Sequence, residues 1–211
     1  MDLMVDLNYE KKFAEQNGYK VMAGMDEVGR GPLAGPVTVA VFVFLKKIDT
    51  EKLKFLRDSK LLSENQRSRM YEFFCELKKQ GKADFASASC FPATIDKYHI
   101  SEASVLAMRR AVKKLSTSVD HVFVDKFPYA GRVLTDTSYT AVKGADNLIP
   151  SVAAASIVAK VRRDRSMANY YHRKYPEYGF DLHKGYGTAM HYKALKKHGP
   201  SPAHRQSFRL A

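Results

Sequence analysis

Apolar and polar residues alternate along the chain in patterns that predict strands first and then strands alternating with helices. Residues 36–45 are almost continuously apolar and rich in Val and Phe, as in a buried strand. After Ser63, apolar residues recur at the spacing of an amphipathic helix, and Ser63 with Gln66 has the pattern of a capping box. The same reasoning predicts strands over 20–26, 83–90, 121–125 and 138–143, and helices over 7–17, 101–115, 150–171 and 188–197.

This order of elements favours a mixed α/β sheet with helices on its faces. The strands 20–26 and 36–45 are joined by residues 29–36, which are dense in Gly and Pro and longer than a tight turn. Small residues along the helix 150–171 permit close packing, and a proline suits its first turn.

The charge of the chain indicates a polyanionic partner. Lys and Arg number 35 against 22 Asp and Glu, a formal net charge of +13 over 211 residues. Nucleic acid, an anionic membrane or nucleotides would all satisfy that charge, and so would a merely basic soluble protein. With 45% apolar residues the chain can bury a core, so disorder is excluded.

Features of cellular location are few and agree with one another. The two cysteines, Cys75 and Cys90, lack metal-ligand spacing, and they are too few for a disulfide framework. The N-terminus mixes acids and bases where a signal peptide needs apolar residues. The longest apolar run, residues 37–45, is too short to span a bilayer. We therefore expect a cytoplasmic protein.

Carboxylates fall where predicted strands end. Asp26 and Glu27 close the first strand, Asp125 closes a later one, and Asp146 precedes the long helix. If those strands are neighbours, the acids converge at the rim of the sheet. Converging carboxylates repel one another unless a cation neutralises them, and hard oxygen ligands suit Mg²⁺ or Mn²⁺. A basic protein with such a site is typical of metal-assisted phosphodiester cleavage.

Each acid also has a simpler interpretation, because an acid after a strand is often a turn residue or a helix cap. Asp146 could cap the helix that follows it, and Lys126 could pair with Asp125. The doublet of Asp26 and Glu27 is harder to explain in that way, because it ends an apolar strand beside a glycine-rich loop.

A family resemblance rests on the segment 24–37, GMDEVGRGPLAGPV, which resembles the N-terminal signature of type 2 ribonuclease H (RNase HII). Further matches follow in order over about residues 20 to 209: Asp58-Ser59-Lys60, Val124-Asp125, Lys143-Gly144-Ala145-Asp146, the helix 154–164, the loops 175–180 and 183–186, and the tail 198–208.

The resemblance implies an RNase H-like fold, a mixed central β-sheet flanked by helices with a small C-terminal helical segment. It implies one catalytic domain over 1–211, with an N-terminal helix in 1–18 and a C-terminal loop and helix, about 172–211, beside the active site. The implied site is a tetrad that binds Mg²⁺ or Mn²⁺, two ions once substrate is bound: Asp26, Glu27, Asp125 and Asp146.

The resemblance also assigns contacts to nucleic acid. Backbone amides of Gly29, Arg30 and Gly31 would approach the ribose 2′-hydroxyl in the minor groove. Tyr186 would stack on the deoxyribose and select the RNA-to-DNA step. Contacts to backbone phosphates would come from Lys60 and Lys184.

The chain departs from the family pattern at two positions. Lys126 stands where a glycine usually follows the third acid, and Ala145 separates Lys143-Gly144 from the fourth. Asp164 therefore competes with Asp146 as a metal ligand, although its spacing from Lys160 favours a supporting salt bridge. Ser59 is a further supporting residue, and His183 either touches the phosphate or has only a structural role.

The predicted activity is cleavage of the RNA strand of RNA–DNA hybrids, including 5′ of single ribonucleotides in duplex DNA, with 5′-phosphate and 3′-hydroxyl products. We expect a monomer, and the sequence does not decide whether a sliding clamp binds it. One alternative is type 3 ribonuclease H, which the Arg30 motif and Tyr186 argue against. Another is a non-catalytic nucleic-acid-binding module, which would not need four acids at strand ends.

Overall fold

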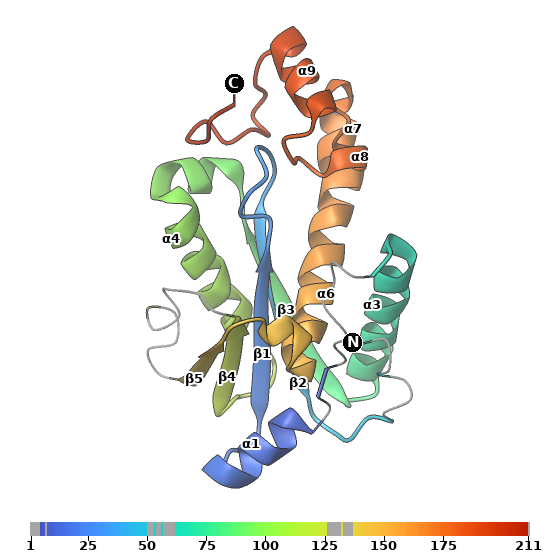
Figure 1. The fold of residues 1–211 in the computed structure, drawn as a ribbon, viewed down its shortest axis with the longest axis vertical. Coiled ribbons are helices and arrows are strands. Elements are labelled where there is room, and N and C mark those ends of the chain that lie inside the picture. Colours follow the sequence, from blue (N-terminus) through green and yellow to red (C-terminus); the bar gives the residue numbers. More distant parts are fainter. Residues whose placement is uncertain are drawn as a thin grey trace.

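Five strands form one mixed sheet in the computed structural model, which describes residues 5–6, 8–49, 53, 56, 62–125, 132 and 137–210. Their order is β3-β2-β1-β4-β5 (Figure 1). The β1–β2 and β2–β3 pairs are antiparallel, whereas β1–β4 and β4–β5 are parallel. The mixed sheet predicted from the element order is confirmed. The strands are β1 Met22–Val28, β2 Val37–Phe44, β3 Ala83–Cys90, β4 His121–Asp125 and β5 Ser138–Val142.

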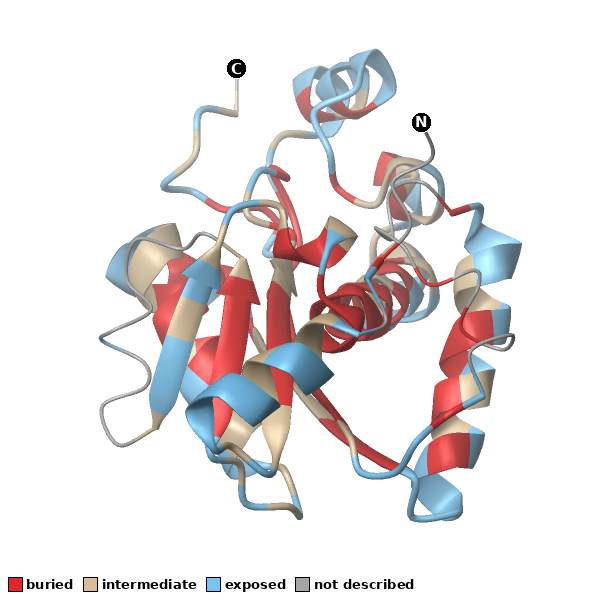
Figure 2. Ribbon diagram, turned by 60° about the horizontal axis from the view of Figure 1, so that its bottom comes forward, coloured by how far each residue is buried: buried red, intermediate tan, exposed pale blue. Residues whose placement is uncertain are grey.

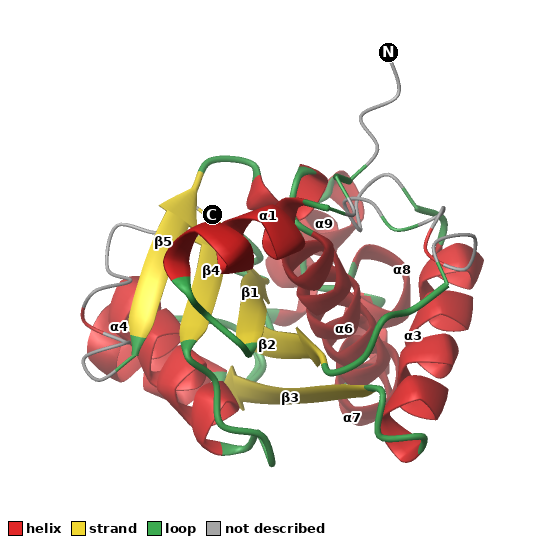
Figure 3. Ribbon diagram, turned by 90° about the horizontal axis from the view of Figure 1, so that it is seen from below, coloured by secondary structure: helices red, strands yellow, loops and turns green. Residues whose placement is uncertain are grey.

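Helices cover both faces of this sheet, as Figures 1 and 3 show. α6 and α3 pack on one face, and α4 packs on the other. The longer helices are α1 Tyr9–Asn17, α3 Glu64–Lys79, α4 Pro92–Lys113, α6 Pro150–Ser166 and α9 Ala189–His198. The short elements are the 3-10 turns η2 Ala145–Asn147 and η4 Pro176–Tyr178, the π-helical turn η3 Met167–Tyr171, and the helices α7 His172–Lys174 and α8 Phe180–His183.

Several predicted boundaries were wrong, including that of the helix 150–171, which changes at Met167 from α6 to the π-helical turn η3. β1 does not stop at its acids but continues to Val28, which pairs with Thr38 of β2. The predicted helix 101–115 begins earlier, at Pro92, with a break at His99, whose φ is 64°. Pro92 suits a first turn because its missing N–H is not needed there, but the residues before the break lack a clear apolar period.

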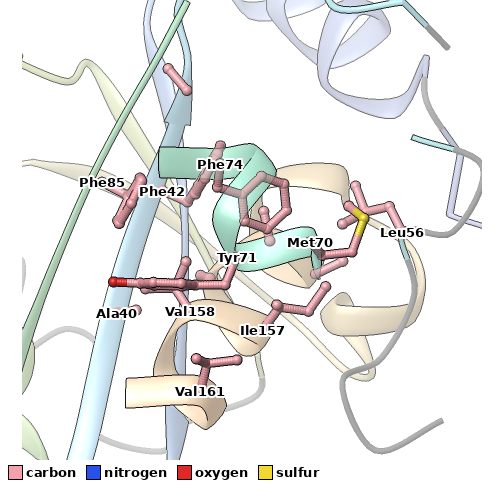
Figure 4. Packing of buried hydrophobic residues seen from close by; sticks show 14 of the residues in the cluster. Ala40, Phe42, Leu56, Met70, Tyr71, Phe74, Phe85, Ile157, Val158 and Val161 are labelled. Atoms are coloured by element: carbon pink, nitrogen blue, oxygen red, sulfur yellow. The ribbon is translucent and has the colours of Figure 1, made fainter. Parts of the chain in front are cut away.

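Side chains of β2 point alternately to the two faces of the sheet and so divide the core into two layers. Figure 2 shows that the central strands and the helix surfaces against them are buried. Val39 and Val41 pack toward α4, whereas Phe42 packs toward α3 and α6. Figure 4 shows Phe42 between Phe74, at 4.8 Å between ring centroids, and Phe85, stacked at 5.6 Å. Burial of such a ring contributes about 1.5–3 kcal/mol, so this cluster anchors α3 to the sheet.

The helix α6 lies unusually close to β1. A Cβ atom added to Gly24 would lie 2.1 Å from the backbone nitrogen of Val152, so only glycine fits there. The adjoining turns of α6 consist largely of small, fully buried residues, chiefly alanine. The sequence predicted this close packing from the small residues. The close approach brings Ser156 of α6 alongside the acidic end of β1.

The chain after α6 builds a separate cluster beyond one end of the sheet, with α7, α8 and α9 at the top of Figure 1. Phe180, Leu195 and Ala203 pack there with Leu33 and Met167. The C-terminal residues therefore reach the loop that joins β1 to β2. In the part of the chain that the structure describes, no helix has both the length and the apolar character needed to cross a bilayer.

Candidate active site

Asp26 is buried near the end of β1 on the face that meets α6. Gly24, two residues earlier, faces the same helix, because strand residues alternate between faces. Burial raises the pKa of the Asp26 carboxyl well above its ordinary value, and the nearby carboxylates of Glu27 and Asp146 raise it further. A hydrogen bond from Ser156 acts in the opposite direction. Asp26 therefore lies where added positive charge would favour its ionised form.

Asp125 lies beside this position because β4 runs parallel to β1, with Met25 paired to Val124. Its carboxylate accepts hydrogen bonds from the backbone amides of Gly144, at 2.8 Å, and Ala145, at 3.3 Å. Asp125 thus holds the loop that leads to Asp146. This is the turn-residue role that the sequence left open, and both of these bonds are accepted by Oδ1.

Asp146 lies in the turn η2 and is 4% exposed. It is not the N-cap residue of α6, which is Ile149, and the amide of Ser151 in the first turn donates to the carboxylate of Glu10 instead, at 3.2 Å. The capping alternative for Asp146 is therefore wrong. Asp146 is close enough to Asp26 to raise the pKa of its carboxyl. The first and fourth predicted acids therefore lie near one another despite the extra residue, Ala145.

Asp164 lies apart from these acids in a network with basic residues. Its carboxylate is 3.0 Å from Lys160 and 4.0 Å from Arg67, and all three side chains are largely buried. The supporting salt bridge predicted from the spacing to Lys160 is present. Lys160 and Arg67 also line a pocket of about 300 Å³, together with Asp26, Glu27, Val28, Ser156 and Tyr186.

Pocket size does not identify the site. Two pockets of about 500 Å³ lie elsewhere, one beside α1 and one between the start of α4 and η3, and none of the predicted acids lines them. The smaller pocket is lined by the predicted site residues Asp26, Glu27 and Tyr186 beside the bases Arg67 and Lys160, a combination suited to nucleic-acid chemistry.

The carboxylates of Asp26, Glu27 and Asp146 suit a hard divalent cation. They repel one another, and a bound cation would neutralise that repulsion. Among the described residues, no three histidine, cysteine or acidic side chains are placed to hold a metal ion by themselves. Waters and phosphate oxygens would complete the coordination, as is usual for Mg²⁺.

The glycine-rich loop, residues 29–36, adjoins the pocket, and the buried side chain of Arg163 supports it from the interior of the protein. Gly29 has φ 89°, and a Cβ atom there would lie 2.2 Å from Nε of Arg163, so a larger residue is excluded. Arg163 is fully buried and donates to the carbonyls of Pro36, at 2.9 Å, and Ala34, at 3.2 Å. Above the loop, Arg30 lies 3.7 Å from Glu27 and Gly31 is exposed.

Tyr186 lies over the same region and is 40% exposed. Arg163 and Lys160 lie 5.7 Å and 5.9 Å from its ring centroid.

Lys184 has a left-handed backbone, and its ammonium donates to the carbonyl of Asp181. Within the described ranges, the ring of His183 bonds to the backbone of Tyr178 and Gly185 alone, which fits its structural alternative. Ser59, Lys60 and Lys126 lie outside the described residues.

Comparison with known proteins identifies the family of this chain. The family model described as Ribonuclease HII matches residues 23–211. The chain belongs to the ribonuclease HII family. The family's activity is endonucleolytic cleavage of the RNA strand of RNA–DNA hybrids, so this family member is an endoribonuclease.

Relatives match over most of their length. A ribonuclease HII of Clostridioides difficile is 43% identical, over 90% of this chain and 71% of the relative. One of Coxiella burnetii is 42% identical, over 93% and 92%. Among solved structures, ribonuclease H2 of Pyrococcus horikoshii is 26% identical with a TM-score of 0.69, covering 91% of this chain and 95% of the other.

Two further structures are informative. A ribonuclease HII of Archaeoglobus fulgidus, solved in complex with PCNA, is 25% identical with a TM-score of 0.71, covering 91% of this chain and 96% of that one. A Bst-RNase HIII solved with Mn²⁺ is 20% identical with a TM-score of 0.68, over 93% and 70%, and shows a shared fold alone.

Proposed function

We propose that this protein cuts on the 5′ side of single ribonucleotides embedded in duplex DNA as well as within longer RNA–DNA hybrids. The products are a 5′-phosphate and a 3′-hydroxyl. The observation that carries this proposal is the pocket that buried Asp26 lines together with Lys160 and Arg67, beside the glycine-rich loop. Acids alone would repel a phosphodiester, and the adjoining bases and exposed loop supply the attraction.

Asp26, Glu27, Asp125 and Asp146 are the residues that would hold Mg²⁺ or Mn²⁺, with two ions once substrate is bound. When bound, such ions activate water for attack at phosphorus and stabilise the leaving oxygen. The chain itself positions the donors: Ser156 holds the Asp26 carboxyl, and Asp125 holds the loop of Asp146. These hydrogen bonds supply the preorganisation that the chemistry requires.

Recognition would be divided between two elements. Backbone amides of Gly29, Arg30 and Gly31 would read the ribose 2′-hydroxyl, and the Tyr186 ring would stack on the neighbouring deoxyribose. Lys184 and Lys60 would contact backbone phosphates. Since these groups recognise sugars and phosphates rather than base edges, we expect little sequence preference.

The proposal extends to partners. The Archaeoglobus fulgidus relative was solved with PCNA, so a sliding clamp is the protein partner that we propose, with the chain itself a monomer. Size-exclusion chromatography with and without a clamp tests both points, since a monomer that does not co-elute with the clamp argues against that partner.

The direct test uses a labelled DNA duplex with one ribonucleotide, incubated with Mg²⁺, Mn²⁺ or EDTA. We expect a metal-dependent nick on the 5′ side of the ribonucleotide. Cleavage of a longer hybrid without that nick would contradict the single-ribonucleotide activity and indicate behaviour like type 3 enzymes. Absence of cleavage on both substrates would leave a binding protein.

A further inference from the structure

Arg205 is a fully buried arginine whose hydrogen-bond partners are backbone carbonyls of the glycine-rich loop. Its Nη2 donates to Gly29 at 2.6 Å, its Nη1 to Arg30 at 2.9 Å and its Nε to Gly35 at 3.0 Å. No acid in the described part of the chain lies within ion-pair distance of it. Burial of a guanidinium is costly unless its donors are satisfied, so the loop carbonyls and Arg205 hold one another in place.

These bonds fix the direction of the amides that the loop presents. The carbonyls of Gly29 and Arg30 belong to the peptide units that carry the N–H groups of Arg30 and Gly31. In a trans peptide the N–H points away from the C=O, and the described chain has no cis peptide bond. With Arg205 beneath the loop, these two amides point to its other side, where Gly31 is exposed.

The residue before Arg205 begins a second line of hydrogen bonds, through two buried histidines. The backbone N–H of Ser201 donates to Nδ1 of His204 at 2.9 Å, a shorter contact than the 3.3 Å to the Ser201 carbonyl. The proton of His204 is therefore on Nε2, which lies 2.9 Å from Nε2 of His191. His191 must accept there, so its Nδ1 carries a proton and donates to the carbonyl of Tyr186 at 2.9 Å.

The tautomers are consistent only if both rings are neutral. Burial lowers the pKa of His204 to about 4, with neighbouring His191 lowering it further, and burial also lowers the pKa of His191. Both rings are therefore uncharged at neutral pH. The line of bonds from Ser201 to Tyr186 has one donor and one acceptor at each contact, and it fixes the backbone of Tyr186.

The C-terminal segment, residues 201–205, is itself attached to the glycine-rich loop. The amide of Gly35 donates to Ala203 at 2.8 Å, and the amide of Arg205 donates to Leu33 at 2.9 Å. The loop in turn touches the Tyr186 segment, because the amide of Leu33 donates to the Gly185 carbonyl at 2.9 Å. One short segment thus supports both recognition elements.

We propose that His204 and Arg205 are specificity-determining positioning residues. Arg205 fixes the amides of Arg30 and Gly31, and His204 fixes Tyr186 through His191. Together they set the spacing between the group that reads the ribose and the ring that reads the next deoxyribose. The inference rests on the proposed function, in which one ribonucleotide beside a deoxyribonucleotide must satisfy both elements at once.

A longer hybrid offers many ribonucleotides and does not need the ring to meet a deoxyribose. A loosened Tyr186 should therefore reduce cleavage at a single ribonucleotide much more than cleavage within a hybrid. Displacement of a positioned group by about 1 Å can reduce a rate on the order of 100-fold.

The test compares His191→Leu, which cannot form either bond, with His191→Gln, whose amide can donate and accept in the same direction. The readout is the ratio of kcat/KM on a single-ribonucleotide duplex to kcat/KM on an all-RNA hybrid strand. We expect H191L to lower that ratio by about 10- to 100-fold and H191Q to restore much of it. His198→Leu, on the exposed side of α9, is the matched control.

Arg205→Lys is the second variant, because it keeps the charge but has one donor group for three carbonyls. Because both substrates present a ribose to these amides, it should lower kcat/KM on both by about 10-fold or more, while the thermal shift on adding Mn²⁺ stays at the wild-type value. Equal losses on both substrates or an unchanged ratio in folded H191L, or unchanged kcat/KM on both substrates in folded R205K, would overturn the inference alone. Wild-type protein that cuts neither substrate would overturn the proposed function, and this inference with it.

Discussion

The carboxylate of Asp125 accepts a 2.8 Å hydrogen bond from the backbone amide of Gly144 and so ties the end of β4 to the loop that carries Asp146. A residue in this position has two separable roles, one in the loop and one toward a cation. An asparagine oxygen can still accept the hydrogen bond, whereas alanine cannot.

Substitution at this position separates the two roles. We expect Asp125→Asn to keep the wild-type Tm within about 2 °C and Asp125→Ala to lose about 1–3 kcal/mol of stability, because two backbone amides lose their acceptor. Both should lose cleavage by at least about 10-fold. Thermal unfolding and a cleavage assay provide the two measurements. Full activity of D125N would reduce Asp125 to a turn residue.

Asp26→Asn should abolish cleavage without loss of stability. The substitution removes a buried charge that Glu27 and Asp146 repel, so we expect an equal or higher Tm. Cleavage should fall on the order of 10³-fold or more, since a metal ligand contributes several kcal/mol to the reaction. A well-folded D26N protein with wild-type activity would contradict the assignment of the site.

Metal binding should distinguish Asp146 from Asp164. Mn²⁺ at about 100 times its Kd would stabilise the wild type by about 2.7 kcal/mol. We expect Asp146→Asn to lose most of that thermal shift. Asp164→Asn should keep the shift but lower the starting Tm, because Lys160 loses a buried partner at 3.0 Å. The reverse pattern would make Asp164 the fourth ligand.

Glu10 should make stability depend on pH. Burial raises the pKa of the Glu10 carboxyl from 4.5 to about 7, although the hydrogen bond from the backbone amide of Ser151 lowers it in part. A carboxyl with a higher pKa in the folded state binds protons more tightly when folded. It therefore contributes stability below pH 4.5 that is lost as the pH rises to about 7.

Glu10→Gln should remove this dependence. Because Glu10 is only half-buried as a residue, we expect the free energy of unfolding of the variant to rise relative to wild type by on the order of 1–3 kcal/mol across that window. Denaturant unfolding at several pH values measures it. Glu15→Gln, exposed on the same helix, is the control, and parallel pH curves for E10Q and wild type would disprove the prediction.

Gly24→Ala should damage the whole site through the fold. The new Cβ would meet the backbone of Val152 at 2.1 Å, so α6 would have to move from β1 at a cost of about 3 kcal/mol or more. The Tm should fall by about 6–12 °C. Gly18→Ala is the contrast: its φ is 75° but its surroundings are open, so only about 1–2 kcal/mol is lost.

The sequence predicted the elements that have strong local signals. The capping box of Ser63 and Gln66 is present, and the strands 83–90 and 121–125 have the predicted bounds. The helix break at His99 had no such signal, because the residue with a φ of 64° there is an exposed histidine and not the glycine that usually marks a positive φ. The placement of Asp26 and Asp125 on neighbouring strands could be predicted, because each follows an apolar run that is visible in the sequence alone.

The supporting residues could not be found in that way. Arg205 and Arg163 look like ordinary surface bases in a chain with 35 of them, and only the structure shows that both are fully buried. The bond between His191 and His204 likewise depends on where α9 packs. A basic residue in a tail that matches a family motif is the one sequence feature that could have suggested a buried role.

The tight contact of α6 with β1 has a consequence for how the protein tolerates changes in length. Ser156, beside the acids, and Arg163, beneath the glycine-rich loop, are separated by seven residues of one helix, about two turns or 10 Å. Substitutions between them leave that interval intact. A single inserted residue would rotate Arg163 by about 100° away from the loop while Ser156 stayed at Asp26. Insertions in this stretch should therefore displace the glycine-rich loop relative to the acidic site, whereas most substitutions there should leave the two in register.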